Sequence, residues 1–254
     1  MTAIVGVLCE DGVVIGSDSA GTLGFPGGST IEQPVKKIAI LGDHVIVAGT
    51  GQVGLGQRFC HLVEGLYGKK EFSDSKRDYI EIDKMLSHGG VEDFAFTGAQ
   101  KGQYDYLVAF SQGRKFYLLE LAEKDFQPEF KTPETPFASL GSGQPITDPF
   151  LGFLKKVFFA NGPPRLQEGR FIAIWALQHA IELNPGGING PVQVAVLKSV
   201  DGQFKASMLE ADELQEQRNS VQAAEEHLRE YKGLLGGGNP VDIPNAPDTP
   251  AAGA

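Results

Sequence analysis

The sequence predicts an α+β protein with one large domain. Three observations lead to this prediction. Short segments rich in β-branched residues gather at the start, middle and end of the chain, and longer segments with apolar residues three or four positions apart separate them. The chain has 254 residues, of which 41% are hydrophobic and 21% charged, enough for one core of about 200 residues plus a tail.

The predicted elements follow one another in a regular order. IVGVL and VVIGSD, joined by the acidic turn EDG, form a first hairpin, and IAIL with VIVAG forms a second. The spacing then predicts helices over QVGLGQRFCHLVEGLYG and, more weakly, around DYIEIDKML. A hairpin around QG follows in YDYLVAFSQGRKFYLLEL. Two helices over 144–160 and 168–184 precede a last strand pair, PVQVAVL and FKASML.

The C-terminal part of the chain differs in character from the rest. Residues 210–235 carry charges of both signs four positions apart, which predicts a helix that ends at GGG. A solvated helix is the simpler interpretation, and a strut between subunits is the alternative. The Pro- and Ala-rich segment 236–254 predicts a disordered tail. We therefore divide the chain into a domain over 2–209, a helical extension over 210–235 and this tail.

Thr2 follows Met1 directly. Methionine aminopeptidase removes an initiator Met before a small residue, so we expect threonine at the mature N-terminus. A free α-amine, with a pKa of about 7.7–8.0, is a base at physiological pH that can activate the hydroxyl of the same residue. The alternative is that Thr2 is only a tolerated second residue.

The first fifty residues supply a context for Thr2. TAIVGVLCEDGVVIGSDSAGTLG, VKKIAIL and VIVAGTG resemble the opening of the proteasome β-subunit family of N-terminal-nucleophile hydrolases. The resemblance is good over residues 2–51 and weak over most of the chain. It implies a four-layer αββα sandwich, whereas composition alone indicates only α+β. The chain looks most like the small bacterial proteasome homologue first noted in betaproteobacteria, and less like the bacterial peptidase subunit that pairs with a ring ATPase.

The resemblance also implies a set of catalytic residues. The nucleophile falls on Thr2, the buried carboxylate on Asp18 and the active-site lysine on Lys37, while a backbone N–H for the oxyanion falls on Gly51 and a serine beside the amine on Ser142. Side chains alternate between the two faces along a strand, so we expect Lys36, the first lysine of VKKIAIL, to point to the face opposite that of Lys37. A lysine charge near the threonine favours the deprotonated amine and hydroxyl.

Each of these assignments has a simpler alternative. Asp18 and Lys37 would also suit a surface salt bridge, worth about 0–1 kcal/mol. The run AGTG resembles a phosphate-binding turn, although it lacks the lysine of a P-loop. The loop LGSG around Ser142 would also serve as a plain helix entry.

The same resemblance implies a substrate site. The first side-chain pocket is implied to be lined by Val35, Ala39, Gly49 and Val53, while Thr22 holds the substrate backbone as an added strand. With Gly49 at its base, we expect this pocket to be roomy and largely uncharged.

The segment ELNPGGING departs from the family pattern. Pro185 and Ile188 stand where many active members carry an aspartate and a serine, and neither side chain can form a hydrogen bond. Loss of such supporting groups commonly lowers activity without abolishing it. Asn189, or a water that it holds, is the candidate replacement near the α-amine.

Composition limits the classes of molecule that we expect the protein to bind. A net charge of −10 argues against nucleic acid and anionic membranes. Cys9 and Cys60 form neither a disulfide framework nor a zinc pattern, and no cofactor or metal motif is present. The start lacks the basic region of a signal peptide, so we expect a cytoplasmic protein.

The function that best fits these features is a threonine-type endopeptidase in a self-compartmentalised, homo-oligomeric ring. Its expected partners are copies of itself in stacked rings and unfolded protein or peptide substrates, and a ring ATPase is a further candidate. Two alternatives stay open: an amidase acting on small amides, and a catalytically weak or inactive ring that serves as scaffold or chamber.

Overall fold

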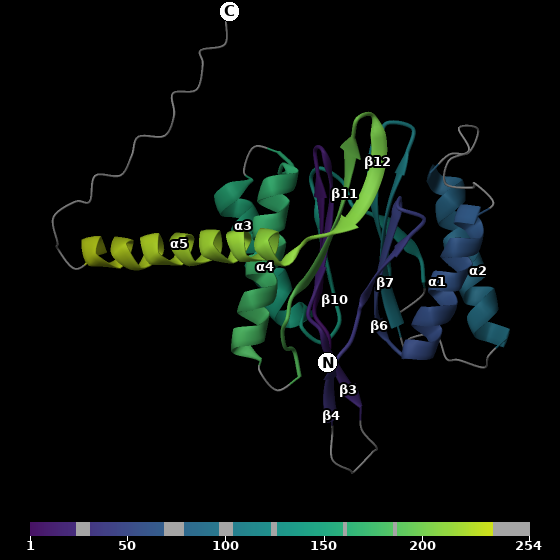
Figure 1. Cartoon of the computed structure of the whole chain (residues 1–254), viewed down its shortest axis with the longest axis horizontal. Helices are drawn as coiled ribbons and strands as arrows, with labels where there is room; N and C mark the ends of the chain where they lie inside the picture. Colours follow the sequence, from purple (N-terminus) through teal and green to yellow (C-terminus); the bar gives the residue numbers. More distant parts are fainter. Residues whose placement is uncertain are drawn as a thin grey trace, which may run out of the picture.

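The computed structural model describes residues 1–23, 31–68, 79–96, 104–122, 126–159, 162–184 and 187–235. Its main elements are two five-stranded antiparallel sheets flanked by helices (Figure 1). The predicted tail over 236–254 lies outside the described residues. Within the described residues, no helix is both long enough and apolar enough to span a lipid bilayer.

The first sheet contains both ends of the domain. Its strand order is β10-β1-β2-β11-β12. The strands are β1 (Ile4–Cys9), β2 (Gly12–Ser17), β10 (Phe137–Leu140), β11 (Gln193–Val200) and β12 (Gln203–Met208). β1 and β2 form the predicted N-terminal hairpin, in which Ile4 pairs with Ser17 and Cys9 with Gly12.

The second sheet has the strand order β5-β6-β7-β8-β9. It is built from β5 (Ile38–Leu41), β6 (Val45–Gly51), β7 (Tyr104–Gln112), β8 (Lys115–Leu121) and β9 (Pro128–Phe130). A separate two-stranded sheet, β3 (Ala20–Leu23) with β4 (Ile31–Pro34), projects beside the N-terminus (Figure 1). Sequence patterns did not reveal β3, β4, β9 or β10, because strands of three or four residues are too short to show an alternation.

Four of the five helices in the described part of the chain cover the outer faces of the two sheets. α1 (Val53–Gly68) and α2 (Tyr79–Phe96) lie on one side, and α3 (Gln144–Phe158) and α4 (Leu166–Leu183) on the other, while α5 (Ala211–Leu235) extends outward from α4 (Figure 1). α2 runs ten residues beyond the predicted segment, through Gly89 and Gly90. Both glycines face close neighbours, which compensates for their low helix propensity.

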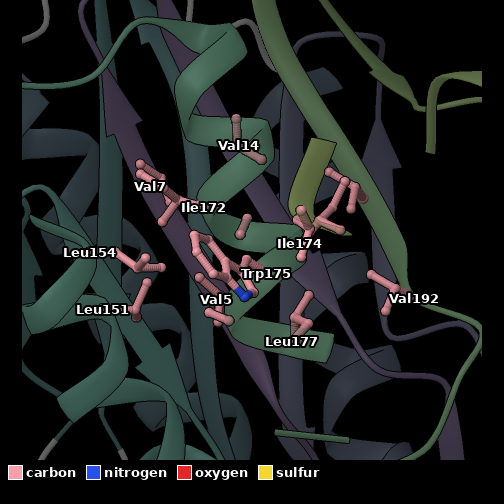
Figure 2. Packing of buried hydrophobic residues seen from close by; sticks show 14 of the residues in the cluster. Val5, Val7, Val14, Leu151, Leu154, Ile172, Ile174, Trp175, Leu177 and Val192 are labelled. Carbon is pink, nitrogen blue, oxygen red and sulfur yellow. The ribbon is translucent and has the colours of Figure 1, made fainter. Parts of the chain in front are cut away.

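Three apolar clusters separate the four layers. On β1, Ile4 and Leu8 point toward the second sheet, whereas Val5 and Val7 point toward α3 and α4. Figure 2 shows the cluster on the helical side, in which Trp175 of α4 packs among residues of β1 and α3. A third cluster joins the second sheet to α1 and α2. The four-layer αββα sandwich that the resemblance implied is therefore confirmed.

Candidate active site

Asp18 ties the start of β1 to the end of β2. Its side chain is fully buried, and the pairing of Ile4 with Ser17 continues to Ala3 and Asp18, where the Asp18 N–H donates to the Ala3 carbonyl at 3.0 Å. The carboxylate accepts from the N–H of Ala3 at 2.9 Å and from the N–H of Ala20 at 3.0 Å. These backbone bonds fix the carboxylate beneath the N-terminus.

Lys37 lies just before β5 and reaches the same point from the second sheet. Its Nζ donates to Asp18 Oδ1 at 2.6 Å, to Thr2 Oγ1 at 3.1 Å and to the carbonyl of Met1 at 3.3 Å. The Lys37 side chain is 7% exposed, and its burial lowers its pKa while Asp18 opposes that shift. Lys36 is exposed, but it lines the same cleft as Lys37, and both lysines precede β5, so the opposite orientation expected from strand alternation stays a prediction. The alternative of a surface ion pair is excluded, because Asp18 is fully buried.

Ser142 lies beside Thr2, as the resemblance implied. β10 pairs Leu140 with Ile4, and in the next turn the N–H of Gly143 donates to the Thr2 carbonyl at 3.0 Å. Ser142 Oγ accepts from the Thr2 N–H at 3.0 Å. The structure retains Met1, so this nitrogen belongs to a peptide bond; after removal of Met1 it would be the α-amine. Gly141 has a φ of +87°, and a Cβ there would come within 2.5 Å of the Thr2 carbonyl oxygen, so only glycine fits.

Gly51 ends β6 at the rim of the site, with a φ of +103°. The N–H of Gly49 faces the Lys37 carbonyl at 3.4 Å. Because alternate N–H groups point to the same edge of a strand, the N–H of Gly51 also lies on the edge that faces Lys37. This is the side from which a substrate carbonyl held at Thr2 would meet it.

A cleft of about 1100 Å³ opens beside Thr2 and Lys37. It is lined by the four residues predicted for the first side-chain pocket, Val35, Ala39, Gly49 and Val53. The backbone of Thr22 lies in β3, but its side chain falls outside the described residues.

The cleft differs from the expected pocket at its base. The ring of Tyr106 lies over Gly49, where a Cβ would come within 2.5 Å of the ring. His61 and Glu64 of α1 also line the cleft, so its wall carries ionisable groups besides the four residues of the predicted first pocket. Sequence reasoning missed Tyr106, because it joins the site only through the pairing of β6 with β7.

The segment 187–190 offers no direct replacement for the missing polar groups. Ile188 is fully buried and packs into the cluster beneath α3 and α4, and Pro185 lies outside the described residues. The Asn189 amide donates to Glu32 at 2.9 Å, and its Oδ1 accepts from the Gly190 N–H at 2.8 Å. These hydrogen bonds direct the Asn189 side chain to Glu32 and Gly190 and not to the Thr2 nitrogen, while support of the amine through a water held by Asn189 stays a prediction.

Comparisons with known proteins agree with this geometry. A family model described as "Proteasome subunit" matches residues 2–97. A proteasome subunit beta of Methanococcus maripaludis (strain C7) is 24% identical over 195 residues, covering 74% of this chain and 80% of the relative. A proteasome subunit beta 1 of Thermococcus gammatolerans is 42% identical over 53 residues, which is 21% of this chain and 25% of that protein.

These matches support assignment of the chain to the proteasome β-subunit family. Solved structures resemble this chain over nearly its whole length. Anbu (ancestral beta-subunit) from Yersinia bercovieri superposes with a TM-score of 0.69 at 13% identity, covering 96% of this chain and 98% of that one. Anbu from Hyphomicrobium sp. strain MC1 gives a TM-score of 0.67 at 14% identity, with 95% and 100% covered. The fold is that of the N-terminal-nucleophile hydrolases.

The described part of the proteasome β-type chain contains no group of three or more His, Cys, Asp or Glu residues arranged to hold a metal ion. The chemistry that the site can supply comes from its own side chains and backbone. The Lys37 ammonium lies within hydrogen-bond reach of the Thr2 hydroxyl and of the buried Asp18 carboxylate, and the Thr2 nitrogen lies within reach of Ser142 Oγ. This combination suits nucleophilic attack on an acyl group.

Proposed function

We propose that this proteasome-like chain is a threonine-type endopeptidase subunit that acts within a self-compartmentalised ring of identical subunits. The observation that carries the proposal is the position of Lys37 Nζ, 3.1 Å from Thr2 Oγ1 and 2.6 Å from the buried Asp18 carboxylate. A cation at that distance stabilises the alkoxide form of the hydroxyl, and the burial of Lys37 limits the screening of its charge by water.

Removal of Met1 by methionine aminopeptidase would convert the Thr2 nitrogen into an α-amine. Thr2 Oγ then adds to the carbonyl carbon of the scissile bond, and its proton passes through a water to the α-amine. The resulting ammonium donates a proton to the leaving amine as the C–N bond breaks. Water adds to the ester and the C–Oγ bond breaks, which restores the hydroxyl.

The other groups of the site stabilise the charge that develops on the substrate or hold the amine and the lysine in position. The N–H of Gly51 is the donor for the tetrahedral oxyanion, a contribution of roughly 2.7–4 kcal/mol at comparable sites. Ser142 holds the amine, with Oγ 3.0 Å from the nitrogen. Asp18 keeps Lys37 in place. Substrates would be unfolded protein or peptides held along β3, and a ring ATPase would deliver them if one exists.

The test is an intact-mass measurement on the purified assembly before and after treatment with a threonine-directed electrophile. We expect loss of the mass of Met1 and one adduct per chain at Thr2, formed faster as the pH rises from 6 to 9 because the α-amine loses its proton. Thr2→Ala should form no adduct and should assemble normally. Retention of Met1 in the active assembly would contradict the mechanism.

A non-catalytic ring is the second candidate, and one observation favours it. Ile188 fills the place of a hydrogen-bonding group with a buried apolar side chain, so the amine has Ser142 but no support from that side. If Thr2 stays unmodified across this pH range in chains that lack Met1, the scaffold function replaces the peptidase.

A further inference from the structure

Tyr106 lies at the centre of the second sheet, in one row with two residues of the site. Gly49 pairs with Tyr106 across β6 and β7, and on its other side Gly49 lies opposite Lys37. Side chains directly opposite on neighbouring strands share a face of the sheet, so Lys37, the space over Gly49 and the Tyr106 ring adjoin one another. The two strand spacings put the Cα atoms of Lys37 and Tyr106 about 10 Å apart.

The ring of Tyr106 is held firmly. It stacks on Phe59 of α1 with ring centroids 4.2 Å apart and meets Phe126 edge-on at 6.1 Å. Gly49 closes the opposite side, because its lack of a Cβ admits the ring. The phenol therefore has one fixed direction, and its Oη is preorganised.

The hydroxyl of Tyr106 has no hydrogen-bond partner among the described residues, although the residue is only 2% exposed. A buried hydroxyl without a partner is unfavourable, and such groups in native proteins are uncommon. Burial also raises the pKa of the phenol, so it stays neutral and able to both donate and accept. A Cβ on Gly56 would lie 3.9 Å from Oη, so this glycine leaves room beside the hydroxyl, and Gly56 itself lines the cleft.

We propose that Tyr106 determines the specificity of the first side-chain pocket by hydrogen-bonding a neutral amide on the residue that precedes the scissile bond. This proposal rests on the peptidase function proposed above. Glutamine presents such an amide at the end of a flexible side chain. A charged side chain is disfavoured at the hydroxyl, because the neutral phenol, packed against Phe59 and Phe126, supplies no charge to offset desolvation.

The first experiment compares two substrates with Gln or Met at that position, which are similar in length. In the native enzyme we expect kcat/KM to favour Gln. Tyr106→Phe keeps the ring and removes the hydroxyl, and it should lower the Gln-to-Met ratio about 3- to 10-fold, the worth of one neutral hydrogen bond. Tyr117→Phe on β8 is the matched control, because Tyr117 does not line the cleft. An unchanged ratio in Tyr106→Phe would overturn the proposal.

A second experiment needs no catalysis. The sequence contains two cysteines: Cys60 lines the cleft, and Cys9 is buried at 5% exposure. In the Thr2→Ala variant, the rate of Cys60 alkylation by iodoacetamide therefore reports whether the cleft is occupied. We expect a peptide amide ending in Gln to protect Cys60 at a lower concentration than its Met counterpart. That difference should vanish in the Thr2→Ala, Tyr106→Phe double variant.

The two experiments separate the pocket from the proposed function. Selective protection by the Gln peptide without any turnover by the native chain would end the peptidase function and support the pocket. Turnover that shows no preference for Gln, or equal protection by both peptides, would overturn the role of Tyr106 and leave the peptidase function standing.

Discussion

At the scale of single residues, Lys37 is the central group of the site, because its Nζ donates hydrogen bonds to Asp18, Thr2 and the carbonyl of Met1. Lys37→Ala should lower the rate of Thr2 labelling at least about 10²- to 10³-fold, the range of a positioned electrostatic group. It should also lower the melting temperature, since a buried carboxylate loses its charged partner. Labelling kinetics and calorimetry measure the two effects.

Lys115→Ala on β8 is the matched control for this prediction. Its side chain is exposed and lies outside the cleft, so both labelling and melting temperature should stay close to those of the native chain. A Lys37 variant with a near-native labelling rate would show that the lysine is structural only.

The resemblance over residues 2–51 was sufficient to select Thr2, Asp18 and Lys37, and the separate segment LGSG added Ser142; the structure brings all four side chains together. Local sequence patterns can locate these residues because the residues lie in or next to strands of regular register. Tyr106 could not be found in this way, because its place over Gly49 depends on a strand pairing between residues far apart in the chain. The hydrogen bond from Asn189 to Glu32 could not be predicted either, because the two residues lie 157 positions apart.

At the scale of elements, α2 contains a carboxylate in an apolar setting. Asp83 is 8% exposed, its Oδ1 has no hydrogen-bond partner among the described residues, and burial raises its pKa to about 6. An unfolded Asp has a pKa of about 3.9, so the native state keeps a proton that the unfolded state loses. The contribution of Asp83 to stability is complete below about pH 4 and is lost as the pH rises through 6.

Asp83→Asn should remove this loss. We expect the free energy of unfolding to increase by about 2–3 kcal/mol at pH 7 and to change little at pH 4, as measured by chemical denaturation. Glu92→Gln on the same helix is the control, because that side chain is 72% exposed and should change stability by less than about 0.5 kcal/mol. A pH-independent effect of Asp83→Asn would mean that the pKa of this carboxyl is not raised in the native state.

α5 is a second element with a testable role. Its Val221 and Gln217 are buried, and Glu225 accepts a hydrogen bond from Trp175 Nε1 of α4 at 3.1 Å. Ending the chain before residue 211 should lower the melting temperature and shift the emission of Trp175, the one tryptophan of the sequence, to longer wavelength. Ending it after residue 235 keeps α5 and is the control. Unchanged emission in the shorter chain would show that α5 does not cover Trp175.

Sequence patterns predicted the long elements well and the short ones poorly. A helix such as α4 shows several turns of apolar spacing, whereas β9 has three residues and owes its place to β8. The order of layers came from the family resemblance, since the same alternation of strands and helices fits other α+β folds.

At the scale of the whole molecule, the proposed activity requires an enclosure. A threonine nucleophile beside a cleft of about 1100 Å³ would cleave cellular proteins indiscriminately if it faced the solvent of the cell. α3 exposes Phe153, Val157 and Phe158, a type of apolar surface that commonly marks an interface. We expect light scattering at micromolar concentration to show large, uniform assemblies. A monomer or dimer would favour an amidase that acts on small amides.

Because the ring of Tyr106 packs over Gly49, we expect the residues at positions 49 and 106 to covary among related sequences. A side chain at 49 and an aromatic ring at 106 cannot occupy the same space, so relatives with a larger residue at 49 should carry a smaller one at 106. In this chain, Gly49→Ala should unfold more readily than the native protein, and adding Tyr106→Leu should restore part of the lost stability. The depth of the pocket would then depend on residues 49 and 106 together. In aligned sequences, covariation between these two positions would indicate where the preferred substrate side chain has changed.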